Sequence, residues 1–385
     1  MQRRNFIKTA GLLGLGAASF PGKLVNAAEP AAAPLQIETA EPYGEITDDF
    51  SDAGLWDPIE LEGGTFNGII QRENENIIIA GGRSAGGYYN GKSTTYDNSV
   101  FRSEDGGEIY KKIAGEDWNS FEGFPTNLVE TEEGRMYMVT NVSADINRKE
   151  SVLWTSESGE FWEEIGDFKG PVVLQAIGER LHVVTADYPQ EFAYESGDPV
   201  DVRSKLSPSG LLHTIESIDS FYIDSQGRRW AGIQPCASVI MTEDGYNWTD
   251  PVMLSPREGG QVARFYEKNE KILAGYSSDG SMIAEFDNEW NREAIRVDDK
   301  EWSVPVLIKP YGEKLLVGTV DPNILYIVDT EARTSEPVSK IDKPNNMKDA
   351  LITDIGALTA TGSGVFLSRN VKKPGQTPVM EWRMY

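Results

Sequence analysis

Carboxylates and tyrosines concentrate in two segments of the chain, residues 83–97 and 187–198. Paired carboxylates can act as general acid and base, and a tyrosine can act as a nucleophile or move a proton. Four residues are therefore the catalytic candidates, namely Asp97, Asp187, Tyr88 and Tyr188.

Cations and aromatic rings accompany these candidates. Arginine forms bidentate pairs with carboxylates, and aromatic rings offer a flat apolar face to a ligand. One of the arginines comes from a third segment, residues 141–149, and another from an inner strand of the repeat described below. The predicted substrate-binding residues are Arg83, Tyr89, Trp118, Arg148 and Arg264.

This mixture of residue types suits a carbohydrate ligand. Two carboxylates would support glycoside hydrolysis, whereas arginines beside tyrosines would support a polysaccharide lyase, in which a base removes a proton next to a neutralised uronate. The sequence does not separate these two reactions. The competing prediction is a non-catalytic protein that binds a glycan or a protein, or serves as an assembly factor.

A repeated pair of strands organises the chain. The second strand of each pair begins at Ile77, Met136, Leu181, Trp230, Ile272 and Leu315, which gives a period of 42–59 residues. A degenerate seventh unit occupies residues 350–385. Short strands bounded by Gly, Asn and Asp turns at this spacing predict an all-β fold, a single β-propeller of seven four-stranded blades. In such a ring the loops between second and third strands share one face, so units 1 to 3 would bring the three segments together.

Three turns in the second halves of these units have a common motif. They run from Ser103 to Tyr110, from Thr155 to Trp162 and from Met241 to Trp248. Each resembles the Asp-box, Ser/Thr-x-Asp-x-Gly-x-x-Trp, of sialidase-like propellers. The resemblance implies turns in which the acid accepts backbone N–H groups and the aromatic ring packs between blades. The Phe/Tyr-Arg-Ile-Pro signature of sialidases is absent, so typical sialidase activity is not expected.

Ring closure has two candidates. Residues 56–64 resemble residues 248–254 and predict an outer strand, whose natural place is the last blade. Residues 379–385 are an equally suitable outer strand for that blade.

The N-terminus resembles a twin-arginine export signal. Arg3 and Arg4 precede a short, glycine-rich apolar run, and Ala27 ends a small-residue cleavage site. We therefore expect a signal peptide over residues 1–27, a flexible leader over 28–48 and the propeller over 49–385. The Tat export machinery would carry the chain to the periplasm or outside the cell. The run is too short for a stable membrane span, and we expect a monomer.

The charge of the chain restricts its partners. It has 36 Lys and Arg against 61 Asp and Glu, a net charge of −25. Such a surface repels nucleic acid, and an anionic ligand would need a local cationic pocket. The chain has two histidines and one cysteine, Cys236, and no phosphate-binding glycine loop. No cofactor is expected, although a structural divalent cation stays open.

Overall fold

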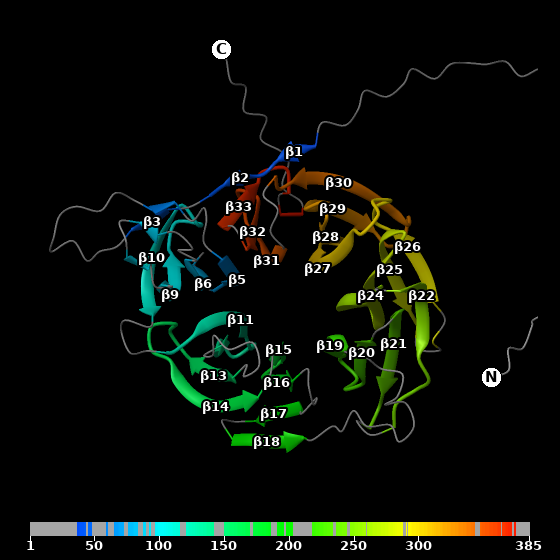
Figure 1. The fold of residues 1–385 in the computed structure, drawn as a ribbon, viewed down its shortest axis with the longest axis horizontal. Helices are drawn as coiled ribbons and strands as arrows, with labels where there is room; N and C mark the ends of the chain where they lie inside the picture. Colours follow the sequence, from blue (N-terminus) through cyan, green and yellow to red (C-terminus); the bar gives the residue numbers. More distant parts are fainter. Residues whose placement is uncertain are drawn as a thin grey trace, which may run out of the picture. The chain divides into compact units, whose positions relative to one another are not determined.

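The computed structural model describes residues 37–374, apart from short gaps of which the longer are 48–58, 61–64, 84–87, 116–120, 142–149, 186–190 and 203–217. All the regular structure in these ranges is β, and the predicted fold class is confirmed. Seven antiparallel sheets, blades 1 to 7 in chain order, each run outward from an innermost strand (Figure 1). No helix of the described ranges is long and apolar enough to cross a bilayer.

The innermost strands contact one another in a closed series, blade 1 against blade 2 and onward until blade 7 meets blade 1. These strands are β5 (Thr65–Gln71), β11 (Phe124–Glu130), β15 (Val172–Ile177), β19 (Ile218–Ile223), β23 (Val262–Lys268), β27 (Val304–Tyr311) and β31 (Met347–Ile352). The second strands are β6 (Ile77–Arg83), β12 (Met136–Asn141), β16 (Arg180–Thr185), β20 (Arg229–Ile233), β24 (Lys271–Ser278), β28 (Lys314–Val320) and β32 (Ala357–Thr361).

The outer strands complete each blade. The third strands are β9 (Asp97–Ser103), β13 (Glu150–Ser156), β17 (Glu191–Glu195), β21 (Cys236–Thr242), β25 (Gly280–Phe286), β29 (Ile324–Asp329) and β33 (Gly364–Ser368). The fourth strands are β10 (Ile109–Gly115), β14 (Glu163–Lys169), β18 (Asp198–Val202), β22 (Val252–Glu258), β26 (Arg292–Arg296), β30 (Thr334–Lys340) and β2 (Glu41–Pro42). A two-stranded ribbon, β7 (Tyr88–Tyr89) with β8 (Lys92–Ser93), lies between β6 and β9 in sequence.

Strand register defines two faces of the ring. Thr65, at the start of β5, pairs with Gly82, and Arg83 pairs with Asp97. Each innermost strand therefore begins on the face that also carries the links between second and third strands, which we call the upper face. The turns that join first to second strands, and third to fourth strands, lie on the opposite, lower face.

The N-terminal residues close the ring by crossing three blades (Figure 1). The strands β1 (Glu38–Thr39), β2 and β3 (Glu45–Thr47) pair with β30, β33 and β10 of blades 6, 7 and 1. We call residues 38–47 the strap. The Glu38 carboxylate also accepts the N–H groups of Arg369 and Asn370, at 3.2 and 3.0 Å.

This closure was not predicted. The outer strand of blade 7 is β2, from residues expected in the leader. The described part of the predicted segment 56–64 is β4 (Ile59–Glu60), which pairs with β3 at the edge of blade 1 and not in the last blade. The other candidate, residues 379–385, lies outside the described residues. Only two residues, Glu41 and Pro42, form the outer strand of blade 7. A strand of two residues is too short to show the alternation of apolar and polar side chains by which strands are predicted from sequence.

The core consists of apolar layers between adjacent blades. Tyr110 has no exposed surface and packs with Phe66 and Phe101 of blade 1 and with Leu358 and Leu367 of blade 7. This bears out the predicted inter-blade position of the box aromatic in the first turn.

The second turn aromatic, Trp162, packs in the same way with Ile78 of blade 1 and Met136 of blade 2. Its indole N–H donates to the Gly159 carbonyl at 2.9 Å. The aromatic residues thus join neighbouring blades by apolar burial.

The acidic turns differ in detail from the predicted alignment. In the first turn, Asp105 accepts N–H bonds from Glu108 and Ile109 at 3.0 Å each, as expected. In the second, Glu157 instead pairs with Arg135 at 3.1 Å. The hydroxyls of Ser156 and Ser158, each one position after the predicted Thr155 and Glu157, accept the N–H groups of Gly159 and Glu160 at 2.8 and 3.1 Å.

The third turn shows the same one-residue shift. Asp244, rather than the predicted Glu243, accepts the Thr242 hydroxyl at 3.0 Å and the Asn247 N–H at 2.7 Å. Short side chains placed directly at the turn reach its N–H groups.

Blade 3 is shorter than predicted. Its third and fourth strands are β17 and β18, within or directly after the segment 187–198, which was expected to be a long loop. Phe192 and Tyr194 alternate in that segment, which is a strand pattern that its length concealed. Blades 1 and 2 do have long links after their second strands.

Candidate central-channel site

A cavity of about 470 Å³ lies on the axis of the ring. It is lined by innermost strands of six blades, all except blade 4. Most of its side chains are aliphatic or amide, with Phe265 and Tyr266 the only aromatic ones. Five charged side chains line it, namely Glu130, Arg264, Lys309, Lys348 and Asp349.

A ring of β-bulges shapes the upper half of this channel. Six of the seven innermost strands shift register between their first and third paired residues, and only β15 pairs without a shift. The skipped residues are Asn67, Thr126, Asp219, Ala263, Val306 and Lys348. A bulge leaves backbone groups unpaired and turns a side chain to a new direction.

The Arg264 side chain donates hydrogen bonds to the backbone at two of these bulges, those of β27 and β31. It follows the bulge of β23, and its Nε donates to the Val306 carbonyl at 2.8 Å. A terminal guanidinium nitrogen donates to the Lys348 carbonyl at 3.5 Å. One side chain of blade 5 thereby reaches blades 6 and 7. It stays exposed to the channel, while desolvation by the enclosing protein lowers the pKa of Arg264, an effect that Asp349 partly opposes.

Lys348 is the second cation of the upper channel. It occupies the bulge of β31 and is half-buried. Desolvation lowers the pKa of Lys348, and the positive charge of Arg264 lowers it further. No carboxylate of the described residues lies within 4.0 Å of the side-chain nitrogens of either cation.

Lys309, in contrast, is neutralised. Its Nζ lies 2.7 Å from the carboxylate of Asp349. The same carboxylate accepts N–H bonds from Ile69, on blade 1, at 3.3 Å and from Ala350 at 2.9 Å. Asp349 therefore joins blades 6, 7 and 1, and its charge is already shared. The upper channel therefore keeps two positive charges that are uncompensated in the sense that no carboxylate of the described residues forms an ion pair with them, inside a strongly acidic protein.

Four of the sequence-predicted site residues belong to blade 1 or to the link after its second strand. Arg83 and Asp97 are direct partners at the upper ends of β6 and β9, and Tyr88 and Tyr89 form β7. The structure thus brings Arg83 and Asp97 together in the backbone of blade 1.

The remaining predicted residues divide into two groups. Arg264 lies in the channel. Trp118, Arg148, Asp187 and Tyr188 lie outside the described residues. The proposed catalytic roles therefore stay predictions.

Sequence reasoning missed Lys348. The seventh unit was predicted to start at residue 350, which left Lys348 outside any strand. The apolar residues Met347 and Leu351 are the only sequence signal that residues 347–352 form a strand. The bulge that turns the Lys348 side chain into the channel has no sequence signature.

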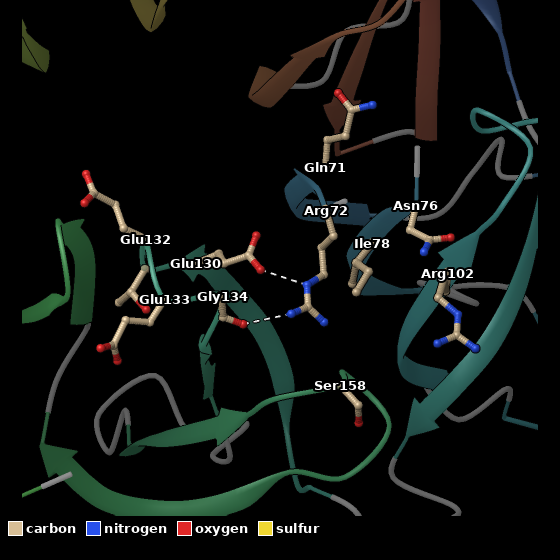
Figure 2. A pocket seen from close by; sticks show the side chains of 11 residues that line it. Gln71, Arg72, Asn76, Ile78, Arg102, Glu130, Glu132, Glu133, Gly134 and Ser158 are labelled. Carbon is tan, nitrogen blue, oxygen red and sulfur yellow. Dashed lines mark hydrogen bonds and ion pairs between the residues drawn. The ribbon is translucent and has the colours of Figure 1, made fainter. Parts of the chain in front are cut away.

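A second cavity, of about 540 Å³, lies on the lower face between blades 1 and 2 (Figure 2). The guanidinium of Arg72 points across it and donates to the Glu130 carboxylate at 2.8 Å and to the carbonyl groups of Gly134 and Glu157. Arg102 pairs with Glu160 at 3.1 Å. Both arginines are therefore occupied in joining two blades, and this crevice is structural.

Fold and channel together define the class, a seven-bladed β-propeller with a ligand-sized cavity on its axis. The described residues contain no cluster of three or more His, Cys, Asp or Glu side chains suited to a metal ion. No protein-family model matches the chain, and no curated protein matches it in sequence.

Solved structures show the same fold. YCF48 from Cyanidioschyzon merolae superimposes with a TM-score of 0.57 at 14% identity, over 80% of this chain and 96% of that one. YCF48 bound to D1 peptide has a TM-score of 0.59 at 11% identity, over 89% and 100%. The extracellular domain of the putative one component system BT4673 from B. thetaiotaomicron has a TM-score of 0.53 at 14% identity, over 79% and 38%. At these identities the likeness concerns the fold alone.

Proposed function

We propose that this chain is a non-catalytic propeller that binds a peptide on its upper face and holds a carboxylate of that peptide in the central channel. The observation that carries the proposal is the pair of uncompensated cations, Arg264 and Lys348, in a protein of net charge −25. Ionised carboxylates are the natural partners of a guanidinium beside an ammonium.

The rest of the lining favours a peptide over a sugar. Sugar recognition relies on aromatic faces, and only Phe265 and Tyr266 are aromatic among the channel residues. Aliphatic side chains with amides such as Asn67 and Asn127 suit the alternating apolar and polar groups of a peptide. The same fold occurs in YCF48 bound to D1 peptide, which supports a peptide as a ligand of suitable shape.

The test is a library of hexapeptides with free carboxyl termini, screened against purified residues 28–385 and followed by titration of the tightest binder. Replacing each carboxylate in turn, by amidation or by Asn and Gln, identifies the anchored group. Arg264→Gln should weaken the selected peptide at least about 30-fold, because truncating one member of an enclosed charge pair costs about 2–5 kcal/mol.

Arg296→Gln is the matched control. Arg296 ends β26 on the upper face, away from the channel lining, and donates to the Asp279 carbonyl. Its substitution should leave affinity unchanged. A library without any binder, or a selected peptide that binds the Arg264→Gln variant equally well, would refute the proposal, provided that the variant melts at the wild-type temperature.

A carbohydrate-active enzyme is the second candidate. The observation in its favour is the pairing of Arg83 with Asp97 at the two ends of the link that contains the two-residue tyrosine strand β7. In this case Asp97 and Asp187 would act as acid and base, with Tyr88 or Tyr188 as nucleophile or proton shuttle. A polysaccharide screen that follows new reducing ends and unsaturated uronates would show turnover, and Asp187→Asn would abolish it without lowering the melting temperature.

We also propose export by the twin-arginine route, because the signal over residues 1–27 precedes a single-domain fold that needs no disulfide. Replacing Arg3 and Arg4 by lysine should leave the unprocessed precursor in the cytoplasm. Normal processing of that variant would argue against this route.

A further inference from the structure

A belt of hydrogen bonds between neighbouring blades surrounds the upper channel. At four of the bulges, a polar side chain at or directly after the bulge bonds to a backbone group on the innermost strand of the next blade. These side chains are Asn67, Ser220, Arg264 and Asp349, and their respective partners are the backbone groups of Pro125, Val262, Val306 and Ile69. The belt therefore joins neighbouring blades and occupies at least one polar atom of each of these side chains.

Asn127 has the same position on blade 2 but no such partner. It directly follows the bulge of β11, lines the channel and is half-buried. The next innermost strand around the ring, β15, pairs without a register shift and therefore lacks the unpaired backbone groups that a bulge exposes. Within the part of the chain that the structure describes, no hydrogen bond involves the Asn127 amide. Its nitrogen and its oxygen are therefore available to a molecule in the channel.

Gln175 shows how a side-chain amide pairs with a backbone in this channel. It also lines the cavity, from blade 3, and its Nε2 donates to the Ile223 carbonyl of blade 4 at 2.7 Å. Its Oε1 accepts the N–H of the same residue at 2.9 Å. The two groups match because an amide side chain and a backbone residue each offer an N–H donor and a C=O acceptor. Asn127 has the same chemical groups as Gln175.

Asn127 and Arg264 lie at one level of the channel on opposite sides of it. Each is the first paired residue after its bulge, Asn127 opposite Val139 and Arg264 opposite Gly275. Blades 2 and 5, which carry them, are separated by two blades in one direction around the ring and by three in the other. A peptide that places a carboxylate at Arg264 and fills the channel therefore contacts Asn127.

We infer that Asn127 is a specificity-determining residue that binds the backbone of the peptide, its Nδ2 donating to the carbonyl and its Oδ1 accepting the N–H of one ligand residue. This inference rests on the proposed function and deepens it, because the peptide bond itself becomes part of what is recognised. Leaving an enclosed donor or acceptor unpaired is costly, so a ligand without an N–H at that position should bind more weakly. Recognition at this point depends on the ligand backbone and not on a particular side chain.

The experiment uses residues 28–385 and the tightest hexapeptide of the library, with each of its peptide bonds replaced in turn by an ester. An ester keeps the shape of the backbone and removes one N–H donor. In the wild-type protein, one of these replacements should weaken binding about tenfold, because it leaves the Asn127 oxygen unpaired. In Asn127→Leu, which keeps the size of the side chain, the unmodified peptide should bind at least about tenfold more weakly and that ester should have almost no further cost. Asn127→Ala should give the same pattern, and both variants should melt close to the wild-type temperature, since the amide has no partner within the described protein.

Gln175→Met is the matched control. It removes an amide of the same channel whose two groups are already paired with Ile223, so it should lower the melting temperature and leave the cost of every ester unchanged. If Arg264→Gln weakens the peptide and every ester costs the same in the wild-type protein and in both Asn127 variants, this inference fails and the proposed function stands. If Arg264→Gln has no effect, the proposed function fails, and the inference that rests on it fails as well.

Discussion

Arg264 and Lys348 bring like charges into one cavity, and at the scale of residues this has a cost for the free protein. The pKa of Lys348 is lowered from 10.5 by desolvation and then by Arg264. The unfolded chain therefore holds this proton to higher pH than the folded protein does. The charge on Lys348 opposes folding at neutral pH, and the penalty disappears as pH rises through the lowered pKa toward 10.5.

Lys348→Met should consequently stabilise the free protein at pH 7. We expect the melting temperature to rise by about 1–3 °C, because the variant removes a desolvated like charge and keeps the length of the side chain. Peptide affinity should fall in the same variant. Differential scanning calorimetry and peptide titration measure the two effects.

Lys309→Met should have the opposite effect on the melting temperature. It removes the partner of Asp349 and leaves a half-buried carboxylate without its ion pair, so its melting temperature should fall. If Lys348→Met also melts lower than wild type, Lys348 is a structural cation and its charge is not reserved for a ligand.

Peptide binding should depend on pH in a way set by Lys348. Both cations and the peptide carboxylate are charged near neutral pH, and affinity should decline as pH rises through the lowered pKa of Lys348. The Lys348→Met variant should show no such decline, because Arg264 stays protonated. Titrations in a series of buffers between pH 7 and pH 10.5 measure this difference, and parallel profiles for the two proteins would contradict it.

At the scale of elements, the acidic turn from Ser103 to Tyr110 combines hydrogen bonding with close packing. Gly107 has a φ of +101°, and a Cβ there would lie 2.9 Å from a methyl carbon of Leu358 on blade 7 and 3.0 Å from the Tyr110 hydroxyl. Gly106, with a φ of +77°, has no atom within 4 Å of such a Cβ. A comparison of substitutions at these two adjacent glycines therefore separates the effect of backbone strain from that of inter-blade contact.

Gly107→Ala should destabilise the protein by about 1–3 kcal/mol, since it adds steric overlap with blade 7 to the strain of a positive φ. Gly106→Ala should cost less, because it introduces the strain alone. Urea unfolding of both variants gives the difference. Equal stabilities would mean that blade 7 does not pack on this turn.

Repeats made the blades predictable, and local geometry limited the prediction of the site. The strand pairs and the inter-blade aromatic residues follow from a period that the sequence displays, and Arg264 was found because it lies on such a strand. Lys348 was missed because a bulge, which depends on pairing with the next strand, directs it into the channel. The acids at residues 157 and 243 were assigned to their turns one position early, because spacing alone cannot separate adjacent polar residues.

At the scale of the whole molecule, ring closure and charge act on the same surface. The strap pairs with the outer edges of blades 6, 7 and 1, and it therefore covers edges that would otherwise expose unpaired N–H and C=O groups. The full chain has 61 acidic against 36 basic residues. Repulsion among these carboxylates opposes the compact state.

Salt should therefore stabilise the protein. Raising NaCl from 0.1 to 1 M shortens the Debye length from about 10 Å to about 3 Å, so repulsion between carboxylates weakens and the melting temperature should rise. At pH 4, where many carboxylates are protonated, the increase should be smaller. An unchanged melting temperature at pH 7 would show that the acidic residues are too far apart to repel one another.

The most direct test of the account is a crystal structure of residues 28–385 with the tightest hexapeptide of the library bound. We predict a peptide carboxylate within hydrogen-bond distance of both Arg264 and Lys348 in the upper channel. A peptide bound over blades 1 to 3 or on the outer strands, with no anion between these two cations, would contradict the assignment of the channel as the binding site.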